Sequence, residues 1–171
     1  AKAISNGYPM GIIFGKEEIM QAAQSTFISS TYWTERIGPT AAIATIEKFI
    51  REDVSSHLIS TGSKIQEAWL SIANKYDLNI HVSGLKPLSH FSFNYSDGQK
   101  MMTIFVQKML ESNILASNRF YASFAHDLDH VSEYKEACDK AFLMIKEAQD
   151  NNSLDDLLKG PVAHSGFKRL T

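Results

Sequence analysis

The sequence predicts an α/β segment with one short strand and helices, followed by a small α+β domain, and three patterns support this prediction. Residues 10–14 form a short uncharged run bounded by turn formers, which is typical of a buried strand. Residues 41–73 carry apolar side chains at helical spacing. Residues 88–95 alternate between two faces and precede helical patterns, which indicates an antiparallel sheet with helices on one face.

Composition limits the possible partners. The chain has 171 residues, of which 44% are hydrophobic, and this is enough for a packed core. A formal charge of -2 argues against a general nucleic-acid binder, and no apolar run is long enough to cross a bilayer. The single cysteine, Cys138, rules out an internal disulfide framework and favours a reducing, cytoplasmic location. Because Cys138 falls in a helical pattern, we expect a packed thiol rather than a nucleophile.

The first candidate for chemistry is Lys2. It precedes a Ser-Asn-Gly turn in which Asn6 and Gly7 tolerate positive φ, and Pro9 fixes the entry into the predicted strand. We therefore expect Lys2 at the foot of a tight turn, beside apolar backbone. A lysine amine becomes a nucleophile towards carbonyls when burial or a nearby charge favours its neutral form. On spacing alone, a solvated lysine without a chemical role is the commoner case.

The segment KAISNGYPMG, residues 2–11, resembles the cofactor-lysine segment of the class III aminotransferases that use pyridoxal phosphate, in particular the glutamate-1-semialdehyde aminomutase-like members. This resemblance implies that Lys2 forms a Schiff base with pyridoxal phosphate and transfers protons once it is freed. It implies a fold-type I enzyme, of which this chain is the carboxy-terminal portion. It also implies a cytoplasmic homodimer acting on amino-acid or amine and keto substrates.

The next segment is expected to be a short helix at residues 16–23 and then a loop at residues 24–37, which is rich in hydroxyls and aromatics. In the family, a threonine of this loop binds the cofactor phosphate, usually from the other subunit. Aligning the following helix puts Thr31 at that position, helped by Ser30. Family members commonly have Gly-Thr and then Gly-Asn-Pro here, so this chain resembles a divergent branch. The alternative for Thr31 is a loop hydroxyl that caps a nearby helix.

The chain is accordingly divided into three predicted parts. Residues 1–60 are the remnant of the cofactor-binding large domain with the linking helix, which begins at Gly38-Pro39. Residues 61–149 are the small α+β domain, and residues 150–171 are a polar carboxy-terminal extension. Within the small domain we expect, in order, strands at 80–82 and 88–95, a helix at 100–112, short strands at 114–115 and 121–124, and a helix ending near 148.

The segment YASFAHD, residues 121–127, is similar to the family's Ser-x-Ala-His-Thr segment before the last helix. Some aminomutase-like members have a glutamate just before this strand, but Phe120 and Tyr121 stand there, so no catalytic carboxylate is assigned. The following cluster resembles metal ligands, namely His126, Asp127, Asp129 and His130. We favour a solvated helix start capped at Asp129 or Ser132, because no cysteine or distant histidine at metal spacing supports a site.

Two other functions remain open from the sequence. One is a non-catalytic α+β binding or regulatory domain, because no partner for the pyridine nitrogen and no ring-stacking residue can be pointed to. The other is a pyridoxal-phosphate enzyme of another reaction type on the same scaffold, such as a decarboxylase or an epimerase.

Overall fold

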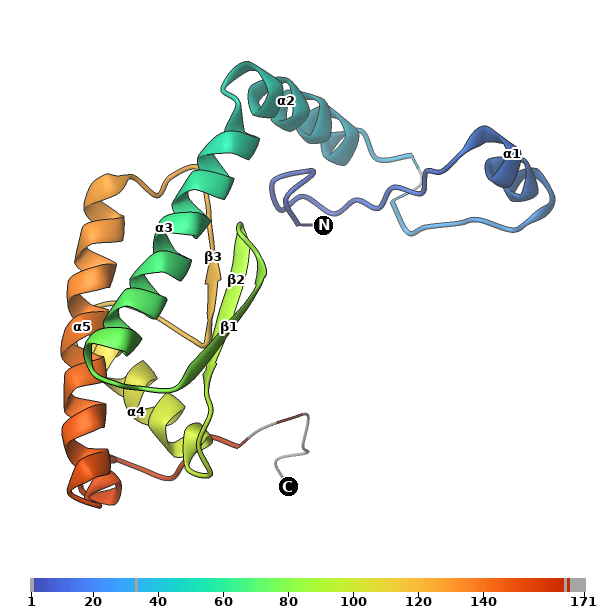
Figure 1. Cartoon of the computed structure of the whole chain (residues 1–171). Helices are drawn as coiled ribbons and strands as arrows, with labels where there is room; N and C mark the ends of the chain where they lie inside the picture. The colour runs from blue at the N-terminus through green and yellow to red at the C-terminus, as the bar shows by residue number, and fades with distance from the viewer. Residues whose placement is uncertain (1, 33, 165, 167–171) are drawn as a thin grey trace. The chain divides into compact units, whose positions relative to one another are not determined.

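The computed structural model describes residues 2–32, 34–164 and 166. The chain divides into two compact units, unit 1 up to Val54 and unit 2 from Ser55 onward (Figure 1). The predicted domain boundaries remain a prediction, and the one between residues 60 and 61 lies inside a helix, α3 (Val54–Lys75).

Unit 1 is built from short elements. A helical turn, α1 (Glu17–Met20), continues into a 3-10 helix, η1 (Gln21–Ser25), where the sequence predicts one short helix. After a loop comes α2 (Ile37–Arg51), which begins where Gly38-Pro39 predicts it. Glu35, which precedes the helix, caps its start. Its Oε1 accepts the backbone N–H groups of Arg36 and Ile37, each at 2.9 Å.

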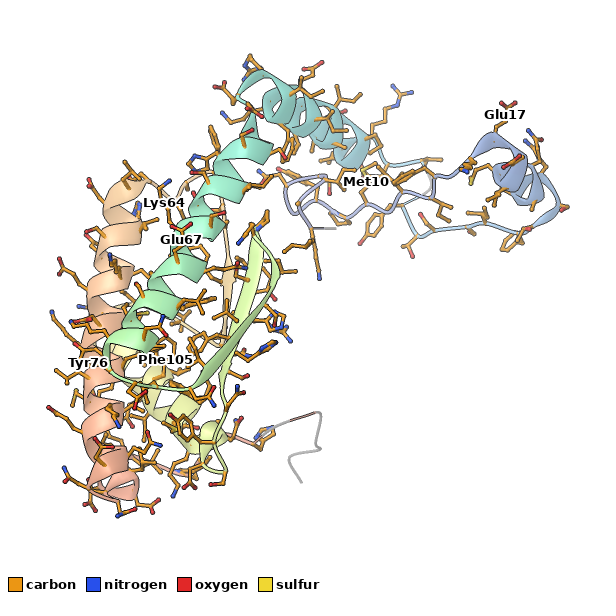
Figure 2. All side chains as sticks on the ribbon, viewed as in Figure 1. Met10, Glu17, Lys64, Glu67, Tyr76 and Phe105 are labelled. Atoms are coloured by element: carbon orange, nitrogen blue, oxygen red, sulfur yellow. The ribbon has the colours of Figure 1, made fainter. Side chains whose placement is uncertain are left out.

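The strand predicted at residues 10–14 is not formed. This segment has no regular secondary structure, and the described residues of unit 1 contain no strand that could pair with it. Its side chains stay in solvent: Ile13 is 65% exposed and Phe14 86%. Figure 2 marks Met10, which begins the segment. An apolar run becomes a strand only when a neighbouring strand satisfies its backbone groups, and the described part of unit 1 contains no such strand.

Unit 2 contains a three-stranded antiparallel sheet in the order β1-β2-β3. Its strands are β1 (Ile80–Leu85), β2 (Leu88–Phe93) and β3 (Arg119–Tyr121). The alternation predicted for β2 is confirmed, because Ser89, Phe91 and Phe93 are buried whereas Leu88, His90 and Ser92 are exposed. The strand expected at 121–124 begins earlier, and none forms at 114–115, where the Leu115 side chain is 92% exposed.

Three helices cover one face of this sheet: α3, α4 (Gly98–Glu111) and α5 (Leu128–Asp150) (Figure 1). The predicted α+β layering is therefore confirmed. Between the layers lie large, fully buried side chains, including Trp69, Phe91, Phe105 and Phe142. The rings of Phe91 and Phe105 meet edge to face with centroids 5.1 Å apart. Figure 2 marks Phe105, which comes from α4.

A glycine in α3 lets the β1–β2 hairpin approach the helix. A Cβ at Gly62 would overlap the backbone carbonyl of Lys86, which lies in the hairpin turn. Nearby, Lys86 Nζ donates to Gln66 Oε1 at 2.6 Å, and Gln66 Nε2 donates to Ser89 Oγ at 2.9 Å. This polar cluster fixes the hairpin on α3.

After α5 the chain forms a 3-10 helix, η2 (Leu154–Leu157). The sequence predicts a polar surface extension from residue 150 onward. The described part of this segment is instead anchored, because Leu154 is only 8% exposed and belongs to the core cluster.

Candidate functional site

The predicted turn after Lys2 is formed. The N–H of Gly7 donates to the carbonyl of Lys2 at 2.9 Å, and the N–H of Tyr8 donates to the carbonyl of Ser5 at 3.1 Å. Asn6 and Gly7 have positive φ of 49° and 96°, as the Asn-Gly pair predicts. Ser5 is fully buried, and its hydroxyl donates to the Tyr8 carbonyl at 2.6 Å. The Lys2 side chain is exposed at the foot of this turn.

Unit 1 contains a cleft of about 780 Å³. One wall is the apolar segment from Pro9 to Ile13, and a further part of the lining comes from the loop that carries Ser29 and Ser30. The first turn of α2 contributes Pro39. This volume lies in the range of small-molecule sites, and a mostly apolar lining with a few polar groups is typical of them.

The polar groups of the cleft differ in what they can offer a ligand. Ser30 Oγ accepts the N–H of Tyr32 at 3.2 Å, which leaves its own O–H to donate. The one acid in the described lining, Glu35, already receives the backbone N–H groups at the start of α2. Hydroxyl donors beside an apolar wall can bind an anionic group attached to a flat apolar ring.

Of the three residues assigned from the sequence, only Ser30 lines this cleft. Thr31 follows it in the same loop and is exposed, and Lys2 lies outside the described lining. The residues present fit the phosphate and the ring face of pyridoxal phosphate, through Ser29 and Ser30 and the segment from Pro9 to Ile13. The one acid of the described lining, Glu35, already accepts two backbone N–H groups through its Oε1, and nothing assigns it to the ring nitrogen. The roles of Lys2, Ser30 and Thr31 therefore stay predictions.

The histidine-rich segment before α5 is a helix cap. The Asp127 side chain accepts the N–H of His130 at 3.0 Å, and the two residues form a reciprocal capping box. The cap is thus Asp127 rather than Asp129 or Ser132. This backbone hydrogen bond is the first cause that lowers the pKa of Asp127. In the part of the chain that the structure describes, no group of three or more His, Cys, Asp or Glu side chains could hold a metal ion.

His126 lies in the loop before this cap. Its Nδ1 accepts the N–H of Ser123 at 3.1 Å, so this nitrogen carries no proton in the bonded form. The pKa of His126 is lowered, first by burial and then by the neighbouring His130 and His57. Both effects favour a neutral imidazole.

Cys138 is a packed thiol, as its helical position predicts. It is fully buried in α5, and burial raises its pKa to about 12. A thiol with this pKa stays protonated at neutral pH and is a poor nucleophile.

The sheet face opposite the helices carries a polar row that the sequence analysis did not anticipate. Ser83, His90 and Arg119 are directly opposite one another on the three strands. Ser83 Oγ and His90 Nε2 are 2.9 Å apart. Such a row can be found from the sequence only when the residues that pair across the strands are known. The strand predicted from the sequence begins at residue 121, whereas β3 begins at Arg119, so the prediction left Arg119 out.

The fold of this chain is that of part of a pyridoxal-phosphate transaminase. A structure of the FumI protein of Sphingopyxis sp. MTA144 in its PLP internal aldimine form superimposes with a TM-score of 0.76. It is 21% identical, and the match covers 91% of this chain and 38% of that one. A transaminase with PLP bound matches with a TM-score of 0.61 and 16% identity, over 72% of this chain and 30% of the other. These likenesses show the fold.

Sequence comparison adds named relatives. The aminopentol aminotransferase of Sphingopyxis macrogoltabida is 22% identical over 143 residues, which are 82% of this chain and 34% of the relative. Glutamate-1-semialdehyde 2,1-aminomutase of Francisella tularensis subsp. tularensis is 27% identical over 71% of this chain and 28% of that enzyme. No family model matches the chain.

The chain is therefore a relative of the class III aminotransferases and aminomutases, and the resemblance seen in the sequence is confirmed. It spans about a third of the length of these two relatives and matches their carboxy-terminal portion. Among the described residues, no helix has the length and apolar character needed to cross a membrane.

Proposed function

We propose that these 171 residues are the carboxy-terminal part of a pyridoxal-phosphate-dependent aminotransferase or aminomutase, which transfers an amino group between an amine or amino acid and a keto compound. One observation carries this proposal: the chain matches enzymes with these names over most of its length, and its fold follows a PLP transaminase over 91% of the chain. We further propose that the enzyme is cytoplasmic, which agrees with the free thiol of Cys138 in this chain.

Lys2 has the central role in this proposal. Its side-chain amine would hold the cofactor, and the same amine, once free, would carry the substrate proton. The turn that follows it supports this role, because the Gly7 N–H to Lys2 carbonyl bond fixes the lysine backbone directly before the apolar wall of the cleft. When bound, the cofactor supplies an electron sink for the substrate carbanion. The chain contributes positioning and proton transfer.

Ser30 and Thr31 hold the cofactor phosphate. Two consecutive hydroxyls on an exposed loop offer O–H donors to a dianionic acceptor. Ser30 lines the cleft and Thr31 is exposed beside it, so the two serve one phosphate from neighbouring positions. We propose that this loop acts across a homodimer interface. Exposed aromatic side chains of unit 1 support such an interface, since Phe27 is 93% exposed and Phe14 86%.

The test is an amino-transfer assay on the proposed complete enzyme. In that enzyme these residues are joined to a part that corresponds to the rest of the length of the relatives. We expect the absorbance spectrum of the purified enzyme to show bound cofactor. Amino-transfer activity should be lost when the enzyme is dialysed against a competing amine, and it should return when pyridoxal phosphate is added. A complete, folded enzyme that neither binds the cofactor nor transfers an amino group would refute the proposal.

A second candidate is a non-catalytic α+β binding domain, and one observation favours it. Unit 2 has a continuous core of its own that includes Trp69, Phe91 and Phe142. Such a domain folds without unit 1. Failure of the complete enzyme to bind cofactor, together with a stable unit 2, is the outcome that selects this candidate.

A further inference from the structure

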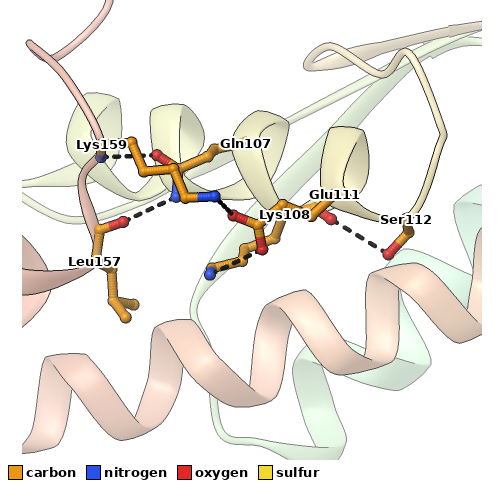
Figure 3. A network of polar contacts seen from close by, with 6 residues as sticks. All are labelled: Gln107, Lys108, Glu111, Ser112, Leu157 and Lys159. Carbon is orange, nitrogen blue, oxygen red and sulfur yellow. Dashed lines mark hydrogen bonds and ion pairs between the residues drawn. The ribbon is translucent and has the colours of Figure 1, made fainter.

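The segment after α5 lies along α4, and α4 contacts its backbone. We call residues 153–163 the tail segment. Gln107 makes two contacts with it: its Nε2 donates to the Leu157 carbonyl at 2.8 Å, and its Oε1 accepts the Lys159 N–H at 2.9 Å (Figure 3). A side-chain amide has one donor face and one acceptor face, so it pairs with an extended backbone as a neighbouring strand does.

The same kind of contact recurs nearer the start of α4. Gln99 Nε2 donates to the Ala163 carbonyl at 2.8 Å, and Thr103 Oγ1 accepts the Ala163 N–H at 3.1 Å. Residues 99, 103 and 107 are spaced by four, so they lie on one face of the helix. Three side chains of one face thus satisfy four backbone groups of the tail segment.

Charge and burial determine the course of the tail segment. Lys100 Nζ lies 2.8 Å from Asp155, and Lys159 Nζ lies 2.7 Å from Glu111. The acidic and basic residues of the tail segment therefore meet opposite charges at opposite ends of α4. The tail residues of these pairs, Asp155 and Lys159, are exposed, so the pairs contribute orientation more than affinity. Burial of Leu154 provides the apolar anchor.

The tail segment has little structure of its own. Beyond η2, residues 158–163 have no regular secondary structure, and Gly160-Pro161 disfavours a helix or a central strand. Its conformation is therefore imposed by α4, whereas α4 is part of the core through Phe105 and Met109. This asymmetry is that of a peptide and its docking surface.

We propose that the face of α4 formed by Gln99, Lys100, Thr103, Gln107 and Glu111 is a docking surface for an extended peptide, and that its occupant is the tail segment of this chain. The tail segment binds as a separable ligand, through its backbone and Leu154. When the link to α5 is cut, it stays bound and exchanges with free peptide.

The test uses the full chain with a site-specific protease sequence inserted between Asn151 and Asn152. These residues are exposed in a turn, where Asn152 has φ of 53°. The folded chain is cut, and the fate of the tail is followed by gel filtration at micromolar concentration. Exchange is then measured with a fluorescein-labelled synthetic peptide of residues 153–164. We expect the cut tail to co-elute with the rest of the chain and the labelled peptide to replace it.

Variants identify the docking surface. Gln107→Ala removes two hydrogen bonds, so peptide affinity should fall about five- to a hundred-fold. A peptide N-methylated at Lys159 loses the N–H donor to Gln107 and should bind about two- to ten-fold more weakly. Leu110→Ala is the matched control, because Leu110 is 59% exposed on α4, and it should leave peptide affinity unchanged.

Three results would overturn the proposal. The cut tail could elute alone, the cut chain could lose its circular dichroism signal or aggregate, or Gln107→Ala could bind the peptide as tightly as the unchanged chain. The first shows that the tail needs its covalent link, and the second that it is an inseparable part of the core. The third shows that α4 does not recognise its backbone.

Discussion

The indole Nε1–H of Trp69 donates to the hydroxyl of Tyr134 at 3.1 Å, inside the core of unit 2. The bond joins α3 to α5 between two residues 65 apart in sequence. Trp69 is fully buried and Tyr134 is only 6% exposed, so the bond lies within the packed core. This hydrogen bond specifies how two long helices pack over one sheet.

Tyr134→Phe should therefore destabilise the chain. The change leaves the indole N–H of Trp69 buried without an acceptor, which should lower the free energy of unfolding by about 1–3 kcal/mol. Urea unfolding followed by tryptophan fluorescence measures it. Tyr121→Phe is the control, because Tyr121 is 60% exposed. Equal stability of the two variants would show that the Trp69 bond contributes nothing.

The pH dependence of stability should include a contribution from His126. Its pKa in the folded chain lies below the ordinary value of 6.5, so the unfolded chain binds more protons between the two values. The contribution of His126 to the free energy of unfolding is therefore fully present above about pH 6.5, and it is lost as the pH falls towards the pKa of His126 in the folded chain. Protonation also breaks the bond from the Ser123 N–H to Nδ1.

Urea midpoints between pH 7.5 and pH 5 test this dependence. The groups around His126 are His57 on α3, His130 on α5 and the nearby Asp127. His126→Gln should flatten the loss of stability on acidification, whereas His81→Gln, at an exposed position of β1, should not. A His126→Gln chain with the same acid sensitivity as the unchanged one would contradict the assignment.

Hydrogen exchange of the 171-residue chain should separate the two units. Amides of β2 and the middle of α5 are hydrogen-bonded around a closed core, so they should be strongly protected. Amides of residues 10–14 have no pairing strand in the described part of unit 1 and should exchange quickly. The chain alone should show no amino transfer. Slow exchange at residues 10–14 would show that unit 1 forms its sheet without further polypeptide.

Unit 2 was largely predictable because its patterns reflect a core that lies within the chain. The alternation of Ser89, Phe91 and Phe93 and the helical spacing in α5 both point into this core. Residues 10–14 have an equally good strand pattern, yet the described residues of unit 1 contain no strand that could pair with them. A periodic pattern predicts which face of an element is buried, but it does not predict whether another strand is present to pair with that element.

The site was less predictable for a related reason. The turn after Lys2 is local and follows from Asn6 and Gly7, so the sequence predicts it well. The cleft depends on a loop that returns to the apolar wall, and no periodicity encodes that return. Likewise the contacts of Gln107 with the tail segment join residues 50 and 52 positions apart, which no short pattern can reveal.

The proposed dimer predicts complementation between two variants of the complete enzyme. Thr31→Ala removes a hydrogen bond to a charged group, so cofactor affinity should fall about ten- to a hundred-fold. Lys2→Ala should be inactive. If Thr31 acts across the interface, a mixed dimer has one site with both defects and one with neither, so activity returns on mixing. Proven subunit exchange without recovered activity would place Thr31 in its own subunit's site or outside any site.

The most direct test of the assignment of Lys2 is borohydride reduction of the complete, cofactor-bound enzyme. The peptide that carries the reduced cofactor is then identified by peptide mapping. Reduction fixes the cofactor to the lysine that holds it, and Lys16 lies close enough in sequence to serve as an internal alternative. We predict a pyridoxyl group on the peptide that contains Lys2 and none on Lys16, with Lys2→Ala abolishing the label. A label on Lys16, or on any other lysine, would contradict the account.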